Sequence, residues 1–372
     1  MKVSAIRKDL QEGVSTVSHA VSQRSSMAIL QNILISTRQD GIYLSATDLE
    51  MSIECLVPCT VDQEGQITIP SKTANEVLNT WPDGTITLES DLSFSTRLTA
   101  ERSEYKLLGR DPDEYTPLIA PTEGVAISVP AGTLKEMIKQ TSFAVASDDT
   151  RPILAGELLE YDGVTLRLVG TDTHRMAVRS AIIGTNALDD VVSAVVPARA
   201  LNELLRIIND YDGDISITLS NTHICFRLAD SPRQVLMTAR LIEGQFPSYQ
   251  RIIPANCTRK LTMETASLLS KCKRVNIVSR DDMNRVTLST SGEYLMLEAQ
   301  SPMSGRAHDE VDMVREGDDI TLICNGRYLV DLLNVLDSDG VQIELTEPLR
   351  PFIVRPVDDD AFLCVMMPMA SG

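Results

Sequence analysis

The residues most capable of chemistry lie close together in the middle of the sequence, where Asp172, His174 and Arg175 occupy one short stretch. A carboxylate that orients an imidazole can make it a general base, so this stretch is compatible with a hydrolase. The sequence supplies no matching nucleophile or phosphate site, because it contains no G-x-S-x-G elbow, no G-x-x-x-x-G-K-[ST] loop and no H-E-x-x-H pair. A hydrolase using Asp172 and His174 is therefore kept only as an alternative.

Metal and disulfide chemistry are not indicated. The four histidines lie far apart, and the seven cysteines are odd in number and include no C-x-x-C pair. That pattern is typical of buried thiols in a reducing compartment. Charged residues interrupt the N-terminus before an apolar signal segment could form, and no run of 18 apolar residues follows. We expect a cytoplasmic protein with no metal, no cofactor and no membrane contact.

The charge balance limits how the protein could bind nucleic acid. The chain of 372 residues has 34 basic and 52 acidic side chains, a formal net charge of −18. Net attraction to a polyanion is excluded at this charge, so any contact with DNA must be local or topological. The composition, 43% hydrophobic and 23% charged, is that of a globular protein, and the length suits two or three domains.

The elements that would position these side chains recur three times along the chain. A helical pattern begins early in each third. The leucines that open its apolar face are Leu10, Leu134 and Leu268. A second helical pattern follows in each third. These second helices start at Ser71, Ala198 and Asn325. Such self-similarity at a fixed period is the signature of a tandem repeat.

Turns and strands recur with the same period. Each third contains a tight turn whose glycine supplies a positive φ. These glycines are Gly41, Gly163 and Gly292. Each second helix stops at an Asp-Gly pair, at 83–84, 212–213 and 339–340, and alternating apolar residues follow. Alternation of this kind indicates half-buried antiparallel strands.

Three units of about 124 residues (372/3) therefore each hold two helices and several hairpins. This is an α+β fold with helices on one face of antiparallel sheet, and the two halves of each unit resemble one another. Proline-rich passages at 117–121 and 247–254 separate the units. We expect domains at 1–122, 123–256 and 257–372.

Four stretches carry a resemblance to a known family. They are 27–34 (MAILQNIL) with 47–51 (TDLEM), 170–178 (GTDTHRMAV), 243–249 (EGQFPSY) and 365–369 (VMMPM). In this order and spacing the chain resembles the bacterial sliding clamp, the beta subunit of DNA polymerase III, over nearly its whole length. Thr173 stands where the family commonly has glycine and Met176 where it has leucine, and three small residues, 370–372, follow Met369.

The resemblance implies a non-catalytic ring of six domains formed by two copies joined head to tail, which encircles duplex DNA. Its dimer interface would contain Tyr105 and Leu107 on one side and Ile277 and Val278 on the other. Twelve helices would line the hole and present basic residues to the phosphates. The candidates on or beside the helices are Arg24, Lys72, Lys135, Lys139, Arg151, Arg199, Arg206, Lys271, Lys273, Arg274 and Arg327.

The resemblance also implies one groove for partner peptides between the second and third units. Its candidate residues are Leu154, Thr171, Thr173, His174, Arg175, Met176, Pro247, Arg251, Ile252, Tyr328, Val365, Met367, Pro368 and Met369. Methionines and aliphatic residues make an adaptable apolar surface, and His174, Arg175 and Arg251 would fix a peptide at its rim. The implied partners are the polymerase III alpha subunit, the clamp loader and other proteins with a clamp-binding motif.

A third class of protein shares the repeat pattern and the acidic balance, namely a tandem-repeat scaffold that never touches DNA. Only the family motifs and the basic residues on the helices separate the two interpretations. The scaffold stays open as an alternative at this point.

Overall fold

The computed structural model describes residues 1–22, 25–147, 150–185, 187–229 and 233–370. Contacts divide the chain into two compact units, residues 1–134 with 199–241 and residues 135–198 with 242–372. Six α-helices lie in the described residues: α1 (Arg7–Ser18), α2 (Ser71–Thr80), α3 (Ala131–Ser142), α4 (Ala198–Ile207), α5 (Thr265–Ser279) and α6 (Gly326–Leu333). Short 3-10 turns lie at Ala28–Gln31, Pro112–Glu114, Pro152–Ala155 and Tyr249–Arg251.

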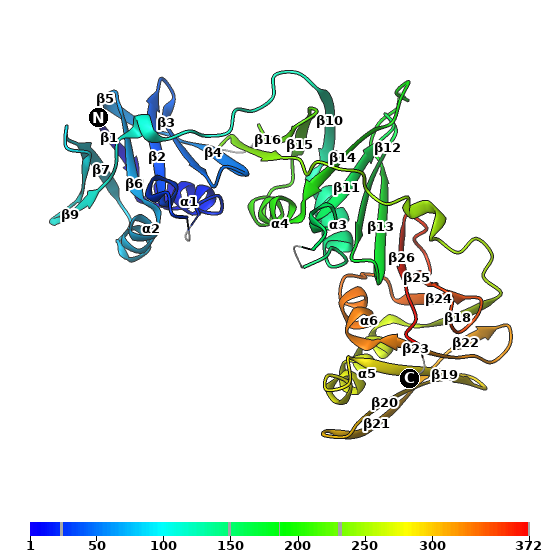
Figure 1. Ribbon diagram of the computed structural model, residues 1–372. Coiled ribbons are helices and arrows are strands. Elements are labelled where there is room, and N and C mark those ends of the chain that lie inside the picture. The colour runs from blue at the N-terminus through cyan, green and yellow to red at the C-terminus, as the bar shows by residue number, and fades with distance from the viewer. Residues whose placement is uncertain (23–24, 148–149, 186, 230–232, 371–372) are drawn as a thin grey trace. The chain divides into compact units, whose positions relative to one another are not determined.

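The first unit contains two antiparallel sheets. The five-stranded sheet has the order β5 (Cys59–Gln63), β1 (Lys2–Ile6), β7 (Thr85–Ser90), β8 (Ser95–Ala100), β9 (Ser103–Leu108). The eight-stranded sheet has the order β10 (Val125–Pro130), β15 (Asp214–Leu219), β16 (His223–Leu228), β17 (Val235–Arg240), β4 (Met51–Val57), β3 (Gly41–Thr47), β2 (Asn32–Arg38), β6 (Gln66–Pro70). In Figure 1, α1 and α2 lie side by side against these strands.

The second unit also contains two antiparallel sheets. The nine-stranded sheet has the order β14 (Val192–Pro197), β11 (Gly156–Tyr161), β12 (Thr165–Thr171), β13 (Arg175–Ile182), β26 (Phe362–Met366), β25 (Phe352–Pro356), β24 (Gly340–Leu345), β18 (Arg259–Glu264), β22 (Val314–Glu316). The four-stranded sheet has the order β21 (Gly305–Asp312), β20 (Tyr294–Ser301), β19 (Arg285–Ser291), β23 (Thr321–Asn325). Helices α5 and α6 pack on each other, and α5 covers β19, β20 and β21 (Figure 1).

Local sequence explains where these elements begin. Each helix follows directly on a strand, and Asn325 caps α6 by accepting the backbone N–H groups of Arg327 and Tyr328. The buried face of α1 includes Leu10, Val14 and Val17, at helical spacing. The α2 and α4 starts agree with the sequence prediction, and α6 begins one residue later than expected. The α+β fold class is confirmed.

The predicted hairpin glycines are confirmed as well. Gly41, Gly163 and Gly292 all have positive φ, at 146°, 91° and 61°. A side chain at any of them would be strained in this conformation. The three Asp-Gly pairs lead into β7, β15 and β24, as the alternating pattern predicts.

The sheets do not stop at the expected domain boundaries. Within the first unit, β4 of the first repeat pairs with β17 of the second. Within the second unit, β13 of the second repeat pairs with β26 of the third. In both cases the last strand of one half-repeat pairs with the last strand of another. The hydrogen-bonded sheets therefore continue from one repeat into the next.

One carboxylate is fully buried in the core. Glu157 on β11 is fully buried and accepts hydrogen bonds from the hydroxyls of Thr141 and Ser142, at the end of α3. Across the strands, Glu157 faces Val196, which lies two residues before α4. In the first repeat the residue equivalent to Glu157 is Ile33, which faces Ile69. Burial raises the pKa of Glu157 to about 7.

We expect Glu157→Gln to stabilise the protein at pH 8 and to have little effect at pH 5. Because the folded pKa of about 7 exceeds the ordinary 4.5, the stability from this group is fully present below pH 4.5 and is lost as the pH rises through 7. The difference at pH 8 should approach about 3 kcal/mol. Calorimetric melting at both pH values checks this, with Glu157→Ile as the repeat-matched control. Lower stability of the glutamine variant at pH 8 would contradict it.

Candidate functional site

The motif that carried the hydrolase hypothesis forms a tight structural turn. Asp172 Oδ1 accepts the backbone N–H groups of His174 and Arg175, both at 2.9 Å, and the Thr171 hydroxyl donates to the Arg175 carbonyl at 2.8 Å. Thr173 has φ 78°, in the left-handed region, which explains why glycine suits this position. The Asp172 carboxylate thus holds the turn through backbone amides.

The first repeat contains the same turn, which identifies it as part of the fold. Asp48 Oδ1 accepts the N–H groups of Glu50 and Met51, at 3.0 and 2.7 Å. The Thr47 hydroxyl donates to the Met51 carbonyl at 2.8 Å, and Leu49 has φ 76°. An Asp that accepts two amides in this way needs no catalytic explanation.

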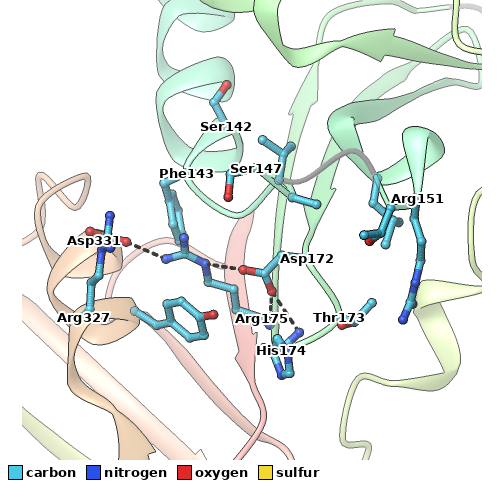
Figure 2. Close-up of a pocket in the computed structure, with 15 residues that line it drawn as sticks. Ser142, Phe143, Ser147, Arg151, Asp172, Thr173, His174, Arg175, Arg327 and Asp331 are labelled. Carbon is cyan, nitrogen blue, oxygen red and sulfur yellow. Dashed lines mark hydrogen bonds and ion pairs between the residues drawn. The ribbon is translucent and has the colours of Figure 1, made fainter. Parts of the chain in front are cut away.

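Arg175 is half-buried and is held by several partners within the protein. Its guanidinium bonds Asp172 at 3.1 Å and Asp331 of α6 at 2.8 Å. It also lies over the Tyr328 ring at 4.2 Å and near the Phe143 ring at 5.3 Å. Only 10% of the side chain is exposed. Figure 2 shows it between Asp172 and Asp331, with Phe143 above. Its donors tie β13 to α6.

A cavity of about 760 Å³ opens beside this arginine. Residues between 142 and 147, residues Thr150, Arg151 and Leu154, the 172–175 turn and α6 line it (Figure 2). Of the predicted groove residues, it contains Leu154, Thr173, His174, Arg175 and Tyr328. Arg151 and Arg327, which were expected to face DNA, also line it. The other predicted groove residues do not line this cavity.

An apolar surface lies on the neighbouring side of the same strand pair. Met176 faces Val365 across the β13–β26 ladder, and both are buried in one cluster with Tyr249. The backbone N–H of Met367 donates to the His174 carbonyl at 2.8 Å, and 40% of Met367 is exposed. Three segments distant in sequence therefore meet here.

The remaining groove candidates take up varied positions around this surface. Thr171 is buried, Pro247, Arg251 and Ile252 are exposed beside the buried Tyr249, and Pro368 and Met369 are half-buried. The backbone N–H of Met369 bonds the Ile323 carbonyl of β23 at 2.8 Å. Sequence reasoning missed Phe143 and Asp331 as walls and Tyr249 as floor. The repeat could have found Tyr249, because Tyr115 is buried against Ile29 and Leu30 in the first repeat.

The junction of the first and second repeats is an internal comparison for this surface. There the Arg240 N–H donates to the Glu50 carbonyl at 2.9 Å, the counterpart of the bond from Met367 to His174. The ladder pair equivalent to Met176 and Val365 is Ser52 opposite Thr238. The two junctions share a backbone arrangement, but at this ladder position the first has serine and threonine where the second has methionine and valine.

The candidate DNA-facing residues lie on or next to helices, and several have acidic partners. Arg199 pairs with Asp48, Arg206 with Glu203 at 2.9 Å and Arg274 with Asp309 at 2.9 Å. Lys72, Lys139 and Lys273 are exposed, and Lys135 and Lys271 are half-buried. Arg24 lies outside the described residues. Among the interface candidates, Tyr105 and Ile277 are 45% and 60% exposed, Val278 is half-buried against the core and Leu107 is buried.

The described residues offer neither a metal cluster nor a membrane span. Within these ranges, no three His, Cys, Asp or Glu side chains gather in a way that could hold a metal ion. In the same part of the chain no helix has the length and hydrophobicity needed to span a bilayer.

Family models match the chain in three consecutive blocks. They are the N-terminal domain of the DNA polymerase III beta subunit over residues 1–119, its central domain over 128–248 and its C-terminal domain over 250–370. A protein named beta sliding clamp from Staphylococcus epidermidis is 31% identical over 362 residues, which covers 95% of this chain and 94% of that protein. The beta sliding clamp of Staphylococcus aureus is 31% identical over 365 residues, with the same coverage.

Solved structures agree with these matches over the full length. The DNA polymerase sliding clamp from Bacillus subtilis has a TM-score of 0.95 and 28% identity, and covers 100% of both chains. The DNA polymerase III subunit beta from Pseudomonas aeruginosa has a TM-score of 0.94 and 27% identity, again with 100% of both chains covered.

We expect Arg175→Lys to lower the free energy of unfolding by about 1–3 kcal/mol, because an ammonium cannot bond two carboxylates while stacked on two rings. His174→Ala, next to it and exposed, is the matched control and should change stability little. Urea unfolding of both variants measures the difference. Equal stability of Arg175→Lys and the unmodified protein would show that the arginine does not tie β13 to α6.

Proposed function

The chain belongs to the bacterial DNA polymerase III beta subunit family, the sliding clamps, and we infer from this the ring, the DNA path and the partner groove described below. It is a non-catalytic DNA sliding clamp, or processivity factor. We propose three clamp domains, residues 1–122, 123–256 and 257–372. Family membership removes the ground for both alternatives, the hydrolase and the scaffold that never touches DNA. A protein of the replication machinery works on chromosomal DNA, so we propose a cytoplasmic location.

Two sheet ends support closure of the ring by a second copy. The last strands of four half-repeats pair with each other within the chain, β4 with β17 and β13 with β26. The last strands of the other two, β9 and β21, lie at the ends of their sheets. If the same rule applies, β21 of one copy pairs with β9 of another. Such a contact is head to tail and closes after two copies.

Residue exposure along the sheets supports this pairing. In the first unit a helix-facing row runs through Ile217, Phe226, Met237 and Ile53, all of them buried. The equivalent row across a β9–β21 seam would run through Leu88, Leu98 and Tyr105 to Ala307 of the partner copy. Tyr105 is 45% exposed and packs edge-on against Trp81 at 5.3 Å between ring centroids. A second copy would cover both Tyr105 and Ala307.

The charge distribution supports a hold on DNA by enclosure. Duplex DNA carries one charge per about 1.7 Å of its axis, and a chain of net charge −18 cannot coat it. Basic residues on the helices would contact phosphates, which carry no sequence information, so the ring stays free to slide. The exposed Lys72, Lys139 and Arg327 are the leading candidates among the described residues.

The surface around Met176, Val365 and Met367, together with the cavity at His174, would take one extended peptide at a time. Aliphatic and methionine side chains adapt to different sequences. The polymerase III alpha subunit, the clamp loader and other proteins with a clamp-binding motif would then compete for this groove. The polar lining at the first junction, Ser52, Thr238 and Arg240, supports a single groove in each copy.

We expect the loaded protein to stay on nicked circular DNA and to be lost when the circle is cut. The reason is topological, since an end lets a ring slide off. Gel filtration of the loaded complex before and after linearisation measures retention, with uncut circles incubated in parallel as the control. Equal retention on both forms would point to ordinary affinity in place of enclosure.

We expect deletion of residues 367–372 to reduce binding of a peptide with the clamp-binding motif of the polymerase by at least about tenfold, because the deletion removes Met367 and the strap bonded to His174 and Ile323. The dimer should persist, since β9 and β21 are untouched. Fluorescence anisotropy gives the peptide affinity. Met367→Ala isolates the side chain, and Arg240→Ala is the control at the matching position of the first junction. Unchanged affinity in both Met367 variants would remove the proposed groove.

A further inference from the structure

The outer face of the β21 edge strand carries an unusual charge cluster. His308 lies between two carboxylates of its own copy, with Nε2 3.1 Å from Glu310 and Nδ1 3.4 Å from Glu298 of β20. Arg306 also bonds Glu298, at 3.1 Å. The hydrogen bond to Glu310 is the main cause that raises the pKa of His308 above its usual range, and Glu298 adds to it. The imidazole is 45% exposed.

Internal repeats assign the residue that would face His308 across the seam. Ala307 of β21, Ile53 of β4 and Ala177 of β13 are equivalent positions. Each lies two residues after the first residue of its strand. Tyr105, Met237 and Cys364 are equivalent positions in the strands β9, β17 and β26. Each faces an equivalent residue of the strand that precedes it in the sequence. Those facing pairs are Leu98 with Tyr105, Phe226 with Met237 and Val354 with Cys364.

The register of the seam follows from these equivalences. Met237 faces Ile53 and Cys364 faces Ala177 in the two junctions within the chain. Tyr105 of one copy therefore faces Ala307 of the other. One step along the antiparallel ladder, Glu104 faces His308 and Lys106 faces Arg306.

Resting on the two-copy ring proposed above, we propose that Glu104 of the second copy completes a cage of three carboxylates around His308, so that a proton on this imidazole tightens the ring. At the same place the two permanent junctions have Leu236 opposite Glu54 and Leu363 opposite Val178. The seam between copies would be the junction that uses a titratable pair.

Several other charges lie near the seam. On β21, Arg306 is bonded to Glu298. On the second copy, Lys106 is 3.9 Å from Asp91 and Glu104 is 3.5 Å from Arg97 of β8. Arg102 precedes β9 in the hairpin and would lie toward Glu310. The Asp309–Arg274 pair, with Lys271 nearby, faces α5 on the opposite side of the sheet.

Distance decides which of these charges dominates. Directly opposite residues of an antiparallel pair have Cβ atoms about 4.5–5.5 Å apart, whereas diagonal neighbours are about 7–8 Å apart. Glu104 is directly opposite His308, and Lys106 is diagonal to it. Both groups are neutralised in part, Glu104 by Arg97 and Lys106 by Asp91. The shorter separation therefore makes the attraction by Glu104 exceed the repulsion by Lys106.

The direction of the pH dependence follows from proton linkage. The separated copy already holds the His308 proton more tightly than a free histidine, whose pKa is 6.5, and the third carboxylate makes the dimer hold it more tightly still. Dimer formation is then coupled to proton uptake. The extra stability of the dimer is fully present when the pH lies below the pKa of His308 in the separated copy. It is lost as the pH rises through the higher pKa that His308 has in the dimer.

Sedimentation equilibrium of the full chain between pH 6 and pH 9 at constant salt tests the proposal. With two seams in each ring, the dimer dissociation constant should rise about three- to tenfold over this range. His308→Gln should remove most of the rise and weaken the dimer at pH 6. Glu104→Gln should also flatten the profile, although it leaves the Glu298 and Glu310 contacts intact.

A double variant and a control complete the design. Glu104→Gln and His308→Gln should be non-additive at pH 6 and additive at pH 9. Glu89→Gln removes a carboxylate of β7, two strands from the seam, and should keep the rise. A dimer whose dissociation constant is independent of pH, or keeps its pH dependence in His308→Gln, overturns this inference alone. A chain that stays monomeric throughout overturns the two-copy ring and this inference with it.

Discussion

One constraint underlies the whole structure. The last strand of each half-repeat needs a hydrogen-bonding partner from outside that half. A strand at a sheet end leaves a row of N–H and C=O groups unpaired, and such rows attract further strands. Strands β4 and β13 meet this need by pairing with β17 and β26. Those two pairings extend the sheets across repeats that are separate in sequence. The same need at β9 and β21 supports the proposed assembly with a second copy.

One backbone arrangement is used at each junction, and side chains alone make the junctions different. The Thr-Asp turn, the strand pair behind it and the amide bond from Arg240 to Glu50 or from Met367 to His174 recur. Serine, threonine and arginine make the first junction polar. Methionine and valine make the second junction apolar. There the ion pairs of Arg175 with Asp172 and Asp331 also hold α6 in place. The proposed partner groove would thus differ from the first junction only through side-chain substitution on a repeated backbone frame.

The net negative charge of the chain is compatible with its action on DNA, because only some of its basic residues are available to contact phosphate. Several helix arginines are paired with acids, as Arg199 is with Asp48 and Arg274 with Asp309. Pairing of this kind lowers the local attraction for phosphate and suits a protein that must move along DNA. Retention then comes from ring closure, and the strength of the seam matters more than the strength of any phosphate contact.

The sequence by itself determined the elements and their threefold recurrence. Helical and alternating periods, the glycines at 41, 163 and 292 and the start of α2 at Ser71 depend on neighbours a few residues away, so local sequence was sufficient. The family motifs also located the stretch 171–176 and the residues near 365 as parts of one site.

Only the tertiary structure decided how those parts meet. Met176 faces Val365, and Arg175 bonds Asp331 and stacks on Tyr328. These partners are so far apart in the sequence that helical or strand periodicity does not relate them. The family resemblance implied that Arg175 fixes a peptide at the groove rim, and the fold shows in addition that Arg175 ties β13 to α6. Strand pairing and burial are set by the summed contacts of whole elements, and a single residue in the sequence does not reveal which of its possible partners the packed chain will provide.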